Sequence, residues 1–364
     1  MAIVKRFFNS FMRSSIWRVD TGSSAEQGSS IHVRAAERHL GRCCVVYADL
    51  AGPKVRTLDV HVRHDARVRI GDRIALVRKL HEAKPDEAAI TCTIPAILDH
   101  LRDGDPMWID DGRIGCVVER VDPSRADLRI TQATERGDRL RPDKGLNFPK
   151  TEIPAAPLSA ADREALAAIL DVIDVVGYSF VRKASDIETL QDELARLGRP
   201  ILPLALKIET LEGVNNLPAL IVQAAGRQPT AVMIARGDLA VEIGYRRLAE
   251  MQEEILWLCE AASIPVIWAT QVLDEFVKTG MPTRAEITDA AYGRTRGLRH
   301  AQQGRTRRSG RGSARRPPPV DGGAPDEEDV AHARPTFLVA GLTPSIVAVS
   351  RSPPGNWRSG ERQS

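Results

Sequence analysis

Several apolar segments of the chain end in side chains that could do chemistry. Lys207 and Glu209 close one such segment and are two residues apart, so on a strand both point to the same face. Asp238 ends the next segment. Two carboxylates with room for water and substrate oxygens suit Mg²⁺. A nearby Lys can neutralise the charge of an enolate or of a transferring phosphoryl group. The other polar segment ends are Ser179, Arg236-Gly237 and Thr270.

Each of these residues also has a purely structural interpretation. A single Lys–Glu pair at a strand end is usually a salt bridge, whereas three successive strand ends with complementary polar groups favour a functional site. Asp49 follows another apolar run and could simply cap a turn. Thr283 and Glu286 fit the pattern of a helix capping box better than that of a binding site.

The elements that must position these side chains alternate between strand and helix. Apolar strand candidates near 175–180, 201–209, 231–238 and 264–271 are separated by amphipathic helical stretches, and Ser159 with Asp162 predicts a helix start. This alternation indicates an α/β fold with a parallel sheet and helices outside. The repeat length favours a (β/α)8 TIM-type barrel over an open sheet, with functional groups at the carboxyl ends of the strands.

Residues 58–144 have a different character. Their runs are short, rich in β-branched residues and punctuated by Gly, and Asp111-Gly112 is a hairpin signal. We expect a small all-β lid inserted into a barrel domain formed by 45–57 and 145–293. Residues 1–44 are expected to be irregular and to lack the first barrel strands, and residues 294–364 to form a separate tail.

Charge is unevenly distributed along the 364 residues. The total is +3, but the tail from Arg294 holds 13 Arg, no Lys and 6 acidic residues, which leaves −4 for the rest. Five scattered Cys have no zinc or disulfide spacing and favour a reducing cytoplasm. No apolar run approaches the ~20 residues of a membrane span. The basic, acid-free first residues resemble a transit peptide only weakly.

Eight stretches resemble, in order, the pyruvate kinase family. They are DLAGPKVRT (49–57), IDDGRI (109–114), KGLNFP (144–149), SFVRKASDI (179–187), LKIETLEGVNN (206–216), MIARGDLAVEI (233–243), ATQVLDEF (269–276) and PTRAEITDAA (282–291). The resemblance implies transfer of phosphoryl from phosphoenolpyruvate to ADP, followed by protonation of the enolate to pyruvate, with positioning and charge neutralisation as the main sources of catalysis.

The resemblance also implies a role for each matching residue. Glu209 and Asp238 would hold Mg²⁺ (or Mn²⁺), Lys207 would stabilise phosphoryl and enolate charge, and Asp49 with the Leu50 carbonyl would help to hold K⁺. The residues expected around phosphoenolpyruvate are Ser179, Phe180, Arg236, Gly237, Asp238 and Thr270, the last also lying near the face where the enolate is protonated. Those expected to contact ADP are Arg56, Lys144 and Asp110.

The two ends of the chain depart from the family pattern. The family has two strands ahead of the one ending at Asp49, and we find no counterpart of the second in 1–44. After Ala291 the family continues with a strand beginning Val-Met-Leu. Arg299 to Gly304 can be encoded so that a reading one base later gives Val-Met-Leu-Asn-Lys-Gly. We hypothesise that residues from about 294 onward are a frameshifted reading or a disordered tail, which puts full activity in doubt.

Other functions remain open at this stage. A metal-dependent aldolase or lyase acting on pyruvate-like enolates would use a similar barrel, but needs no lid over ADP. A catalytically inert fragment, or a pseudoenzyme whose Arg-rich tail binds nucleic acid, is the non-enzymatic alternative. The tail holds few aromatic residues, which argues against nucleic acid. The resemblance is compatible with a homo-oligomer, and we expect no membrane partner.

Overall fold

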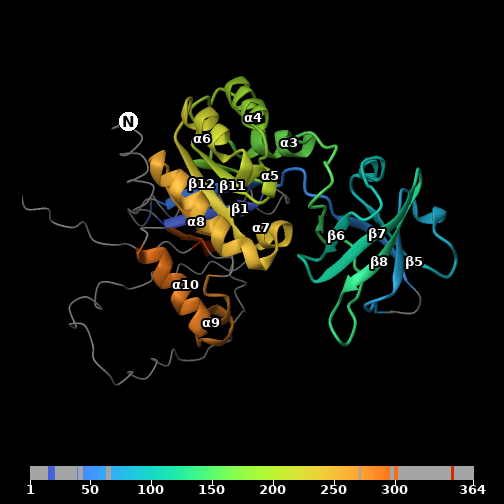
Figure 1. The fold of residues 1–364 in the computed structure, drawn as a ribbon. Coiled ribbons are helices and arrows are strands. Elements are labelled where there is room, and N and C mark those ends of the chain that lie inside the picture. Colours follow the sequence, from blue (N-terminus) through green and yellow to red (C-terminus); the bar gives the residue numbers. More distant parts are fainter. Residues whose placement is uncertain are drawn as a thin grey trace, which may run out of the picture.

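A computed structural model describes residues 15–20, 39, 44–62, 67–269, 272–295, 299–301 and 346–347. Two sheets organise these residues into a barrel domain and a lid (Figure 1). Among the described helices, none is both long enough and apolar enough to cross a lipid bilayer.

The barrel sheet has eight strands in the order β14-β13-β12-β11-β10-β2-β1-β15. All neighbours pair in parallel except β15, which is antiparallel to β1 and also lies close to β14. Seven parallel strands within the described residues form an incomplete (β/α)8 barrel, as predicted. The strands are β1 (Ser15–Asp20), β2 (Cys44–Leu50), β10 (Val175–Tyr178), β11 (Leu204–Ile208), β12 (Thr230–Ala235), β13 (Val266–Ala269), β14 (Arg299–Ala301) and β15 (Ile346–Val347).

Helices follow the barrel strands and cover the outside of the sheet. Ile187, Leu190 and Leu194 recur at helical spacing on α4 and are fully buried in the main core. Burial of such stripes against the sheet is the main driving force for this domain. The helices are α3 (Ala160–Ile169), α4 (Ala184–Arg196), α5 (Leu211–Asn215), α6 (Leu217–Ala225), α7 (Arg236–Ile243), α8 (Tyr245–Ala261), α9 (Asp274–Thr279) and α10 (Arg284–Thr295).

Both predicted capping boxes are confirmed. The Ser159 hydroxyl accepts from the Asp162 backbone N–H while the Asp162 carboxylate accepts from the Ser159 N–H, which starts α3. Thr283 and Glu286 exchange the same pair of bonds ahead of α10. Backbone N–H groups of Thr283, and then Glu275, lower the pKa of Glu286. The structural interpretation of this pair is therefore the correct one.

The lid is a seven-stranded sheet with a hydrophobic core of its own. Its order is β3-β5-β4-β8-β7-β6-β9, and only β4 and β5 pair in parallel. The elements are β3 (Thr57–His61), β4 (Arg73–Val77), η1 (Leu80–Glu82), β5 (Ala88–Cys92), η2 (Pro95–Asp99), β6 (Pro106–Ile109), β7 (Ile114–Asp122), β8 (Arg125–Gln132) and β9 (Leu146–Asn147).

The predicted hairpin joins β6 to β7. Asp110, Asp111 and Gly112 all have positive φ, 57°, 54° and 82°, which Asp and Gly tolerate better than most residues. A Cβ on Gly112 would lie 3.1 Å from a methyl of Val241 on α7, so the tip of this hairpin lies against the barrel. The lid sheet begins at Thr57 and ends at Asn147, slightly beyond the expected 58–144, because KGLNFP supplies the short edge strand β9 beside β6.

Two expectations about the chain ends are wrong in part. The segment 1–44, expected to be irregular, contains β1, which pairs with β2 along its whole length from Ser15↔Cys44 to Asp20↔Asp49. The tail contains β14 and β15, and β14 pairs with β13 where the family pattern calls for the next strand. These strands form by backbone pairing with a neighbouring strand. The pattern of apolar residues within a segment does not show such pairing. The remainder of both segments lies outside the described residues, and the frameshift hypothesis stays a prediction.

Candidate active site

Lys207 is at the centre of a cluster formed by three adjacent strands. Its ammonium donates to the Ser179 hydroxyl at 2.8 Å and lies 3.2 Å from Glu209 Oε1 and 3.5 Å from Asp49 Oδ2. The side chains of Lys207, Asp49 and Glu209 are 12%, 6% and 3% exposed. The prediction that Lys207 and Glu209 share one face is confirmed, and the salt bridge of the structural interpretation is present as part of a larger group.

Glu209 carries its charge in unfavourable surroundings. Burial raises the pKa of the Glu209 carboxyl, the Lys207 charge opposes that rise, and the negative charges of Asp238 and Asp49 add to it. Glu209 Oε2 accepts the backbone N–H of Phe180 at 2.6 Å. The Lys207 ammonium thus lies between two carboxylates, those of Glu209 and Asp49, and the charge of Asp238 acts on Glu209 as well.

Asp49 forms a hydrogen bond with a tyrosine and lies opposite a glycine on the neighbouring strand. The Tyr47 hydroxyl donates to Asp49 Oδ1 at 2.8 Å. Gly177 on β10 pairs with Asp49, and a Cβ there would lie 2.0 Å from the Tyr47 hydroxyl and 2.2 Å from Asp49 Oδ1. Only Gly leaves room for this buried pair. Asp49 therefore faces Lys207 inside the barrel rather than capping a turn, and Leu50 beside it is fully buried.

Asp238 has its own cation, which the sequence analysis missed. Lys54 Nζ lies 2.7 Å from Asp238 Oδ1, 3.7 Å from Asp111 Oδ1 in the lid hairpin and 5.5 Å from the centre of the Phe180 ring. Lys54 lies on the segment that leads from β2 into the lid. Lys54 belongs to the DLAGPKVRT stretch, and its place in that stretch was the signal by which it could have been found from the sequence. Its ammonium connects the site to the lid.

Arg236 pairs with an acidic residue of α10. It begins α7 and forms an ion pair with Asp289 on α10, with Nη1 2.6 Å from Oδ2. Gly237 follows it at the first turn of α7. Phe180 has a positive φ of 54° at the end of β10, next to Gly52, whose Cβ would lie 2.6 Å from the Ser179 carbonyl oxygen. Thr270 lies outside the described residues.

The residues predicted to contact nucleotide lie on the barrel-facing edge of the lid. Lys144 Nζ is 2.8 Å from Asp110 Oδ1, so two of the three predicted residues pair with each other. Arg56 is more exposed and lies 3.5 Å from Asp143, with its backbone bridged to Gly145. In this lid hairpin it is Asp111 rather than Asp110 that approaches the barrel cation Lys54.

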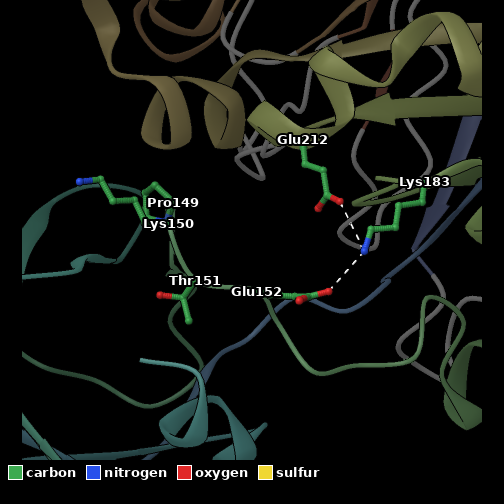
Figure 2. A pocket seen from close by; sticks show the side chains of 6 residues that line it. All are labelled: Pro149, Lys150, Thr151, Glu152, Lys183 and Glu212. Carbon is green, nitrogen blue, oxygen red and sulfur yellow. Dashed lines mark hydrogen bonds and ion pairs between the residues drawn. The ribbon is translucent and has the colours of Figure 1, made fainter. Parts of the chain in front are cut away.

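A polar hollow of about 320 Å³ lies where the chain returns from the lid to the barrel (Figure 2). Lys183 spans it, with its ammonium 3.3 Å from Glu152 Oε1 and 3.6 Å from Glu212 Oε1. Glu152 belongs to the returning segment, whereas Lys183 precedes α4 and Glu212 is on α5. The hollow is lined by Pro149, Lys150, Thr151, Glu152, Lys183 and Glu212, none of which belongs to the predicted site.

Comparison with known proteins identifies the family. The model of the pyruvate kinase barrel domain matches residues 16–297. The chain belongs to the pyruvate kinase family. It is 31% identical over 272 residues to the pyruvate kinase of Geobacillus stearothermophilus, covering 74% of this chain and 45% of that enzyme. It is 33% identical over 264 residues to that of Agrobacterium vitis, covering 71% and 52%.

The Mycobacterium tuberculosis pyruvate kinase is 31% identical over 260 residues, or 71% of this chain and 52% of that enzyme. The chain thus spans about half the length of the curated relatives it matches. Within the described part of this pyruvate kinase family member, no group of three or more His, Cys, Asp and Glu side chains is arranged to hold a metal ion. Asp238 lies near enough to Glu209 for its charge to raise the pKa of Glu209.

Proposed function

We propose that this chain is a phosphotransferase that moves the phosphoryl group of phosphoenolpyruvate to ADP. The enolate that remains takes up one proton, so that the products are ATP and pyruvate. The observation that carries the proposal is the shared ammonium of Lys207, buried among Ser179, Asp49 and Glu209 at the carboxyl ends of three adjacent strands.

The acidic residues fit a divalent cation. Glu209 and Asp238 would hold Mg²⁺ or Mn²⁺, because carboxylate oxygens are the ligands such ions prefer and because the charge of Asp238 raises the pKa of Glu209. When bound, the ion would neutralise charge on the substrate oxygens and the transferred phosphoryl group. Asp49 and the Leu50 carbonyl would supply oxygens for K⁺.

Lys207 would stabilise the charge that develops on the phosphoryl group and on the enolate oxygen. A fixed ammonium in a site that excludes water interacts more strongly with developing charge than one in solution. Its contacts with Ser179, Glu209 and Asp49 orient the ammonium before substrate binds. Ser179, which accepts a hydrogen bond from it, and Phe180 would line the substrate pocket.

The first turn of α7 would bind the substrate carboxylate. Backbone N–H groups at a helix start point outward and favour an anion, and Arg236, Gly237 and Asp238 form this turn. The Thr270 hydroxyl would complete the pocket and lie near the face where the enolate is protonated. Arg56, Lys144 and Asp110 would meet the nucleotide phosphates from the lid.

The lid favours this reaction over aldol chemistry. The contacts from the lid hairpin to Lys54 and to Val241 join a separate domain to the site, and such a domain would serve a second substrate. An aldolase acting on one small enolate has no need of it. Homo-oligomer formation and a cytoplasmic location stay predictions.

Measurement of two reactions on the same preparation tests the proposal. With Mg²⁺ and K⁺ present, pyruvate and ATP should appear in equal amounts from phosphoenolpyruvate and ADP, and neither should appear without ADP. Retro-aldol cleavage that releases pyruvate without ADP would instead establish a lyase. A chain that binds phosphoenolpyruvate with Mg²⁺ but turns over neither substrate would be a non-catalytic member of the family.

A further inference from the structure

The carboxylate of Asp289 holds two side chains from two other elements. Arg236 Nη1 lies 2.7 Å from its Oδ1 and 2.6 Å from its Oδ2, and the Trp268 indole N–H donates to Oδ1 at 3.1 Å. Asp289 is on α10, Arg236 on α7 and Trp268 on β13. The Asp289 side chain is 23% exposed and that of Arg236 12%, so water screens the pair only partly.

Arg236 also contacts the end of β13. Its Nε donates to the carbonyl of Ala269, the last residue of β13, at 3.0 Å. Its guanidinium also lies 4.9 Å from the centre of the Trp268 ring, at stacking distance. Arg236 directly follows β12, so its planar guanidinium connects the end of β12 to the end of β13. Asp289 fixes the orientation of this guanidinium.

The start of α7 has no side-chain cap of its own. The residue ahead of the helix is Ala235, and its side chain makes no capping hydrogen bond. A capping side chain fixes the start of a helix. At α7 the contacts of the Arg236 side chain with Ala269 and Asp289 hold the first residue of the helix instead.

We propose that Asp289 is a positioning residue of the active site. Through Arg236 it sets where the first turn of α7, with the backbone of Gly237 and the carboxylate of Asp238, lies relative to the end of β13. This inference rests on the proposed function, because that turn is where substrate carboxylate and divalent cation would bind. Asp289 itself touches neither.

The variant D289N tests the proposal because it keeps the size of the side chain and removes its charge. With phosphoenolpyruvate present, we expect the Mn²⁺ concentration at half-saturation, followed by the resonance of free Mn²⁺, to rise about 10-fold, since groups that orient a metal ligand typically change affinity by ~10–100-fold. Hydrogen exchange of the amides of 237–243 should be faster than in the unmodified chain. ADP binding, which involves the lid, should be unchanged.

D274N is the matched control. Asp274 lies on the neighbouring helix α9, pairs with Lys278 four residues on, and has no place in the site. It should leave both the Mn²⁺ midpoint and the exchange of 237–243 unchanged. If D289N lowers the melting temperature but moves neither of these readouts beyond the control, Asp289 is merely structural and the proposal is wrong.

Two further variants keep the test decisive if D289N does not fold. R236K keeps the charge but loses the planar fork and the bond to Ala269, and should raise the Mn²⁺ midpoint. W268F removes the indole N–H that donates to Asp289, together with part of a buried ring, and should raise the midpoint less than R236K does. No shift in either would overturn the proposal. An unmodified chain that binds no Mn²⁺ would refute the proposed function alone, and the exchange of 237–243 would still decide the role of Asp289.

Discussion

The barrel and the lid both contain clusters of charged residues, but the pKa values of their acidic residues shift in opposite directions. In the barrel site, burial raises the pKa of Glu209, and its neighbours Asp238 and Asp49 add to the rise. In the lid, the hydrogen bond from Arg73 lowers the pKa of Glu119. At Glu87, burial raises the pKa, but the hydrogen bonds and charge of Arg125 lower it, and the net shift is downward.

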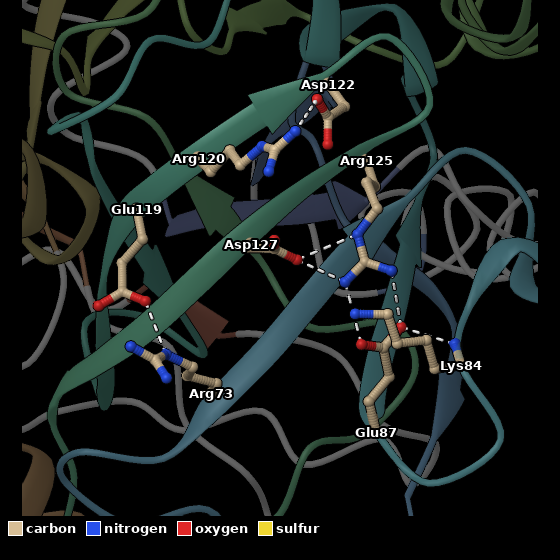
Figure 3. A network of polar contacts seen from close by, with 8 residues as sticks. All are labelled: Arg73, Lys84, Glu87, Glu119, Arg120, Asp122, Arg125 and Asp127. Carbon is tan, nitrogen blue, oxygen red and sulfur yellow. Dashed lines mark hydrogen bonds and ion pairs between the residues drawn. The ribbon is translucent and has the colours of Figure 1, made fainter.

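The lid network supplies an arginine to each of its principal acids (Figure 3). Arg125 donates from two nitrogens to both oxygens of Glu87 at 2.9 Å and also pairs with Asp127, while Arg73 and Arg129 reach Glu119 at 2.7 and 2.8 Å. In the barrel, the carboxylates of Asp49, Glu209 and Asp238 lie around the ammonium groups of Lys207 and Lys54, and the charges of Asp238 and Asp49 raise the pKa of Glu209. The lid acids are thus stabilised by arginine, whereas we propose that a bound cation would stabilise the charge of Glu209.

The largest expected effect comes from removing the shared ammonium. Lys207→Met should lower kcat for pyruvate formation by ~10²–10³ or more, as the loss of a preorganised charge-stabilising group does. Because the substitution also leaves the buried Glu209 and Asp49 without this ammonium, the melting temperature is measured beside kcat to show that the variant is folded. Lys278→Met, which changes an exposed lysine on α9, is the control and should leave kcat unchanged. Equal rates for both variants would contradict the role of Lys207.

A methyl group at Gly177 should damage the barrel site through packing. Gly177→Ala would push a Cβ to about the positions of the Tyr47 hydroxyl and an Asp49 oxygen, both buried. Overpacking of this kind costs about 1–3 kcal/mol of unfolding free energy, which denaturant titration measures. Gly198→Ala is the comparison, because its positive φ of 80° adds strain but a Cβ there meets nothing within 4 Å. A larger loss at Gly198 would show that steric crowding at Asp49 is not the cause.

In the lid, an equivalent charge removal should affect stability and not catalysis. Glu87→Gln removes the charge that Arg125 holds through two hydrogen bonds, and hydrogen bonds to charged groups contribute roughly 1.5–3 kcal/mol each when buried and less when partly exposed. We expect a loss of about 1–2 kcal/mol in the unfolding of the lid. The kcat should stay within about twofold of the unmodified value. A large fall in kcat without a fall in stability would assign this network a catalytic role.

A pH dependence of stability is expected where the two domains meet. Burial raises the pKa of Glu242 on α7 to about 7, the hydrogen bond with Asn147 of the lid opposes this rise, and the charge of Asp238 adds to it. Asn147 Oδ1 is buried and has no hydrogen-bond partner among the described residues, so a protonated Glu242 could donate to it.

Since the folded pKa of Glu242 is higher than the unfolded one, the folded chain binds more protons in between, and stability falls as pH rises from about 5 to about 8. Glu242→Gln should flatten this part of the profile of unfolding free energy against pH, whereas Glu250→Gln on the exposed side of α8 should not. A slope that persists in Glu242→Gln would remove Glu242 as its origin.

Sequence patterns predicted the parts of the molecule that depend on local spacing. Apolar runs gave β2 and β10 to β13, and the two-residue spacing placed Lys207 beside Glu209. The hairpin at Asp111-Gly112 followed from turn chemistry. The short strands β1, β14 and β15 were missed, since they form by pairing with distant strands and have weak patterns of their own.

The site residues that were missed act through contacts between distant segments. Lys54 reaches Asp238 from 184 residues earlier in the chain, and Asp289 reaches Arg236 from 53 residues later. No spacing rule within one element reports such a pair. Tyr47, two residues before Asp49, was not singled out in the sequence, and only the structure shows that its hydroxyl donates to the carboxylate opposite Gly177.

Thermal unfolding with and without Mg²⁺ most directly tests the claim that the barrel site, unlike the lid, is built for an added cation. Mg²⁺ should raise the melting temperature of the unmodified chain and of Glu87→Gln. It should have no effect on Glu209→Gln, which without Mg²⁺ should be at least as stable as the unmodified chain, because a costly buried charge is gone. A Glu209→Gln variant that is destabilised, and that responds to Mg²⁺ as strongly as the unmodified chain, would contradict the account.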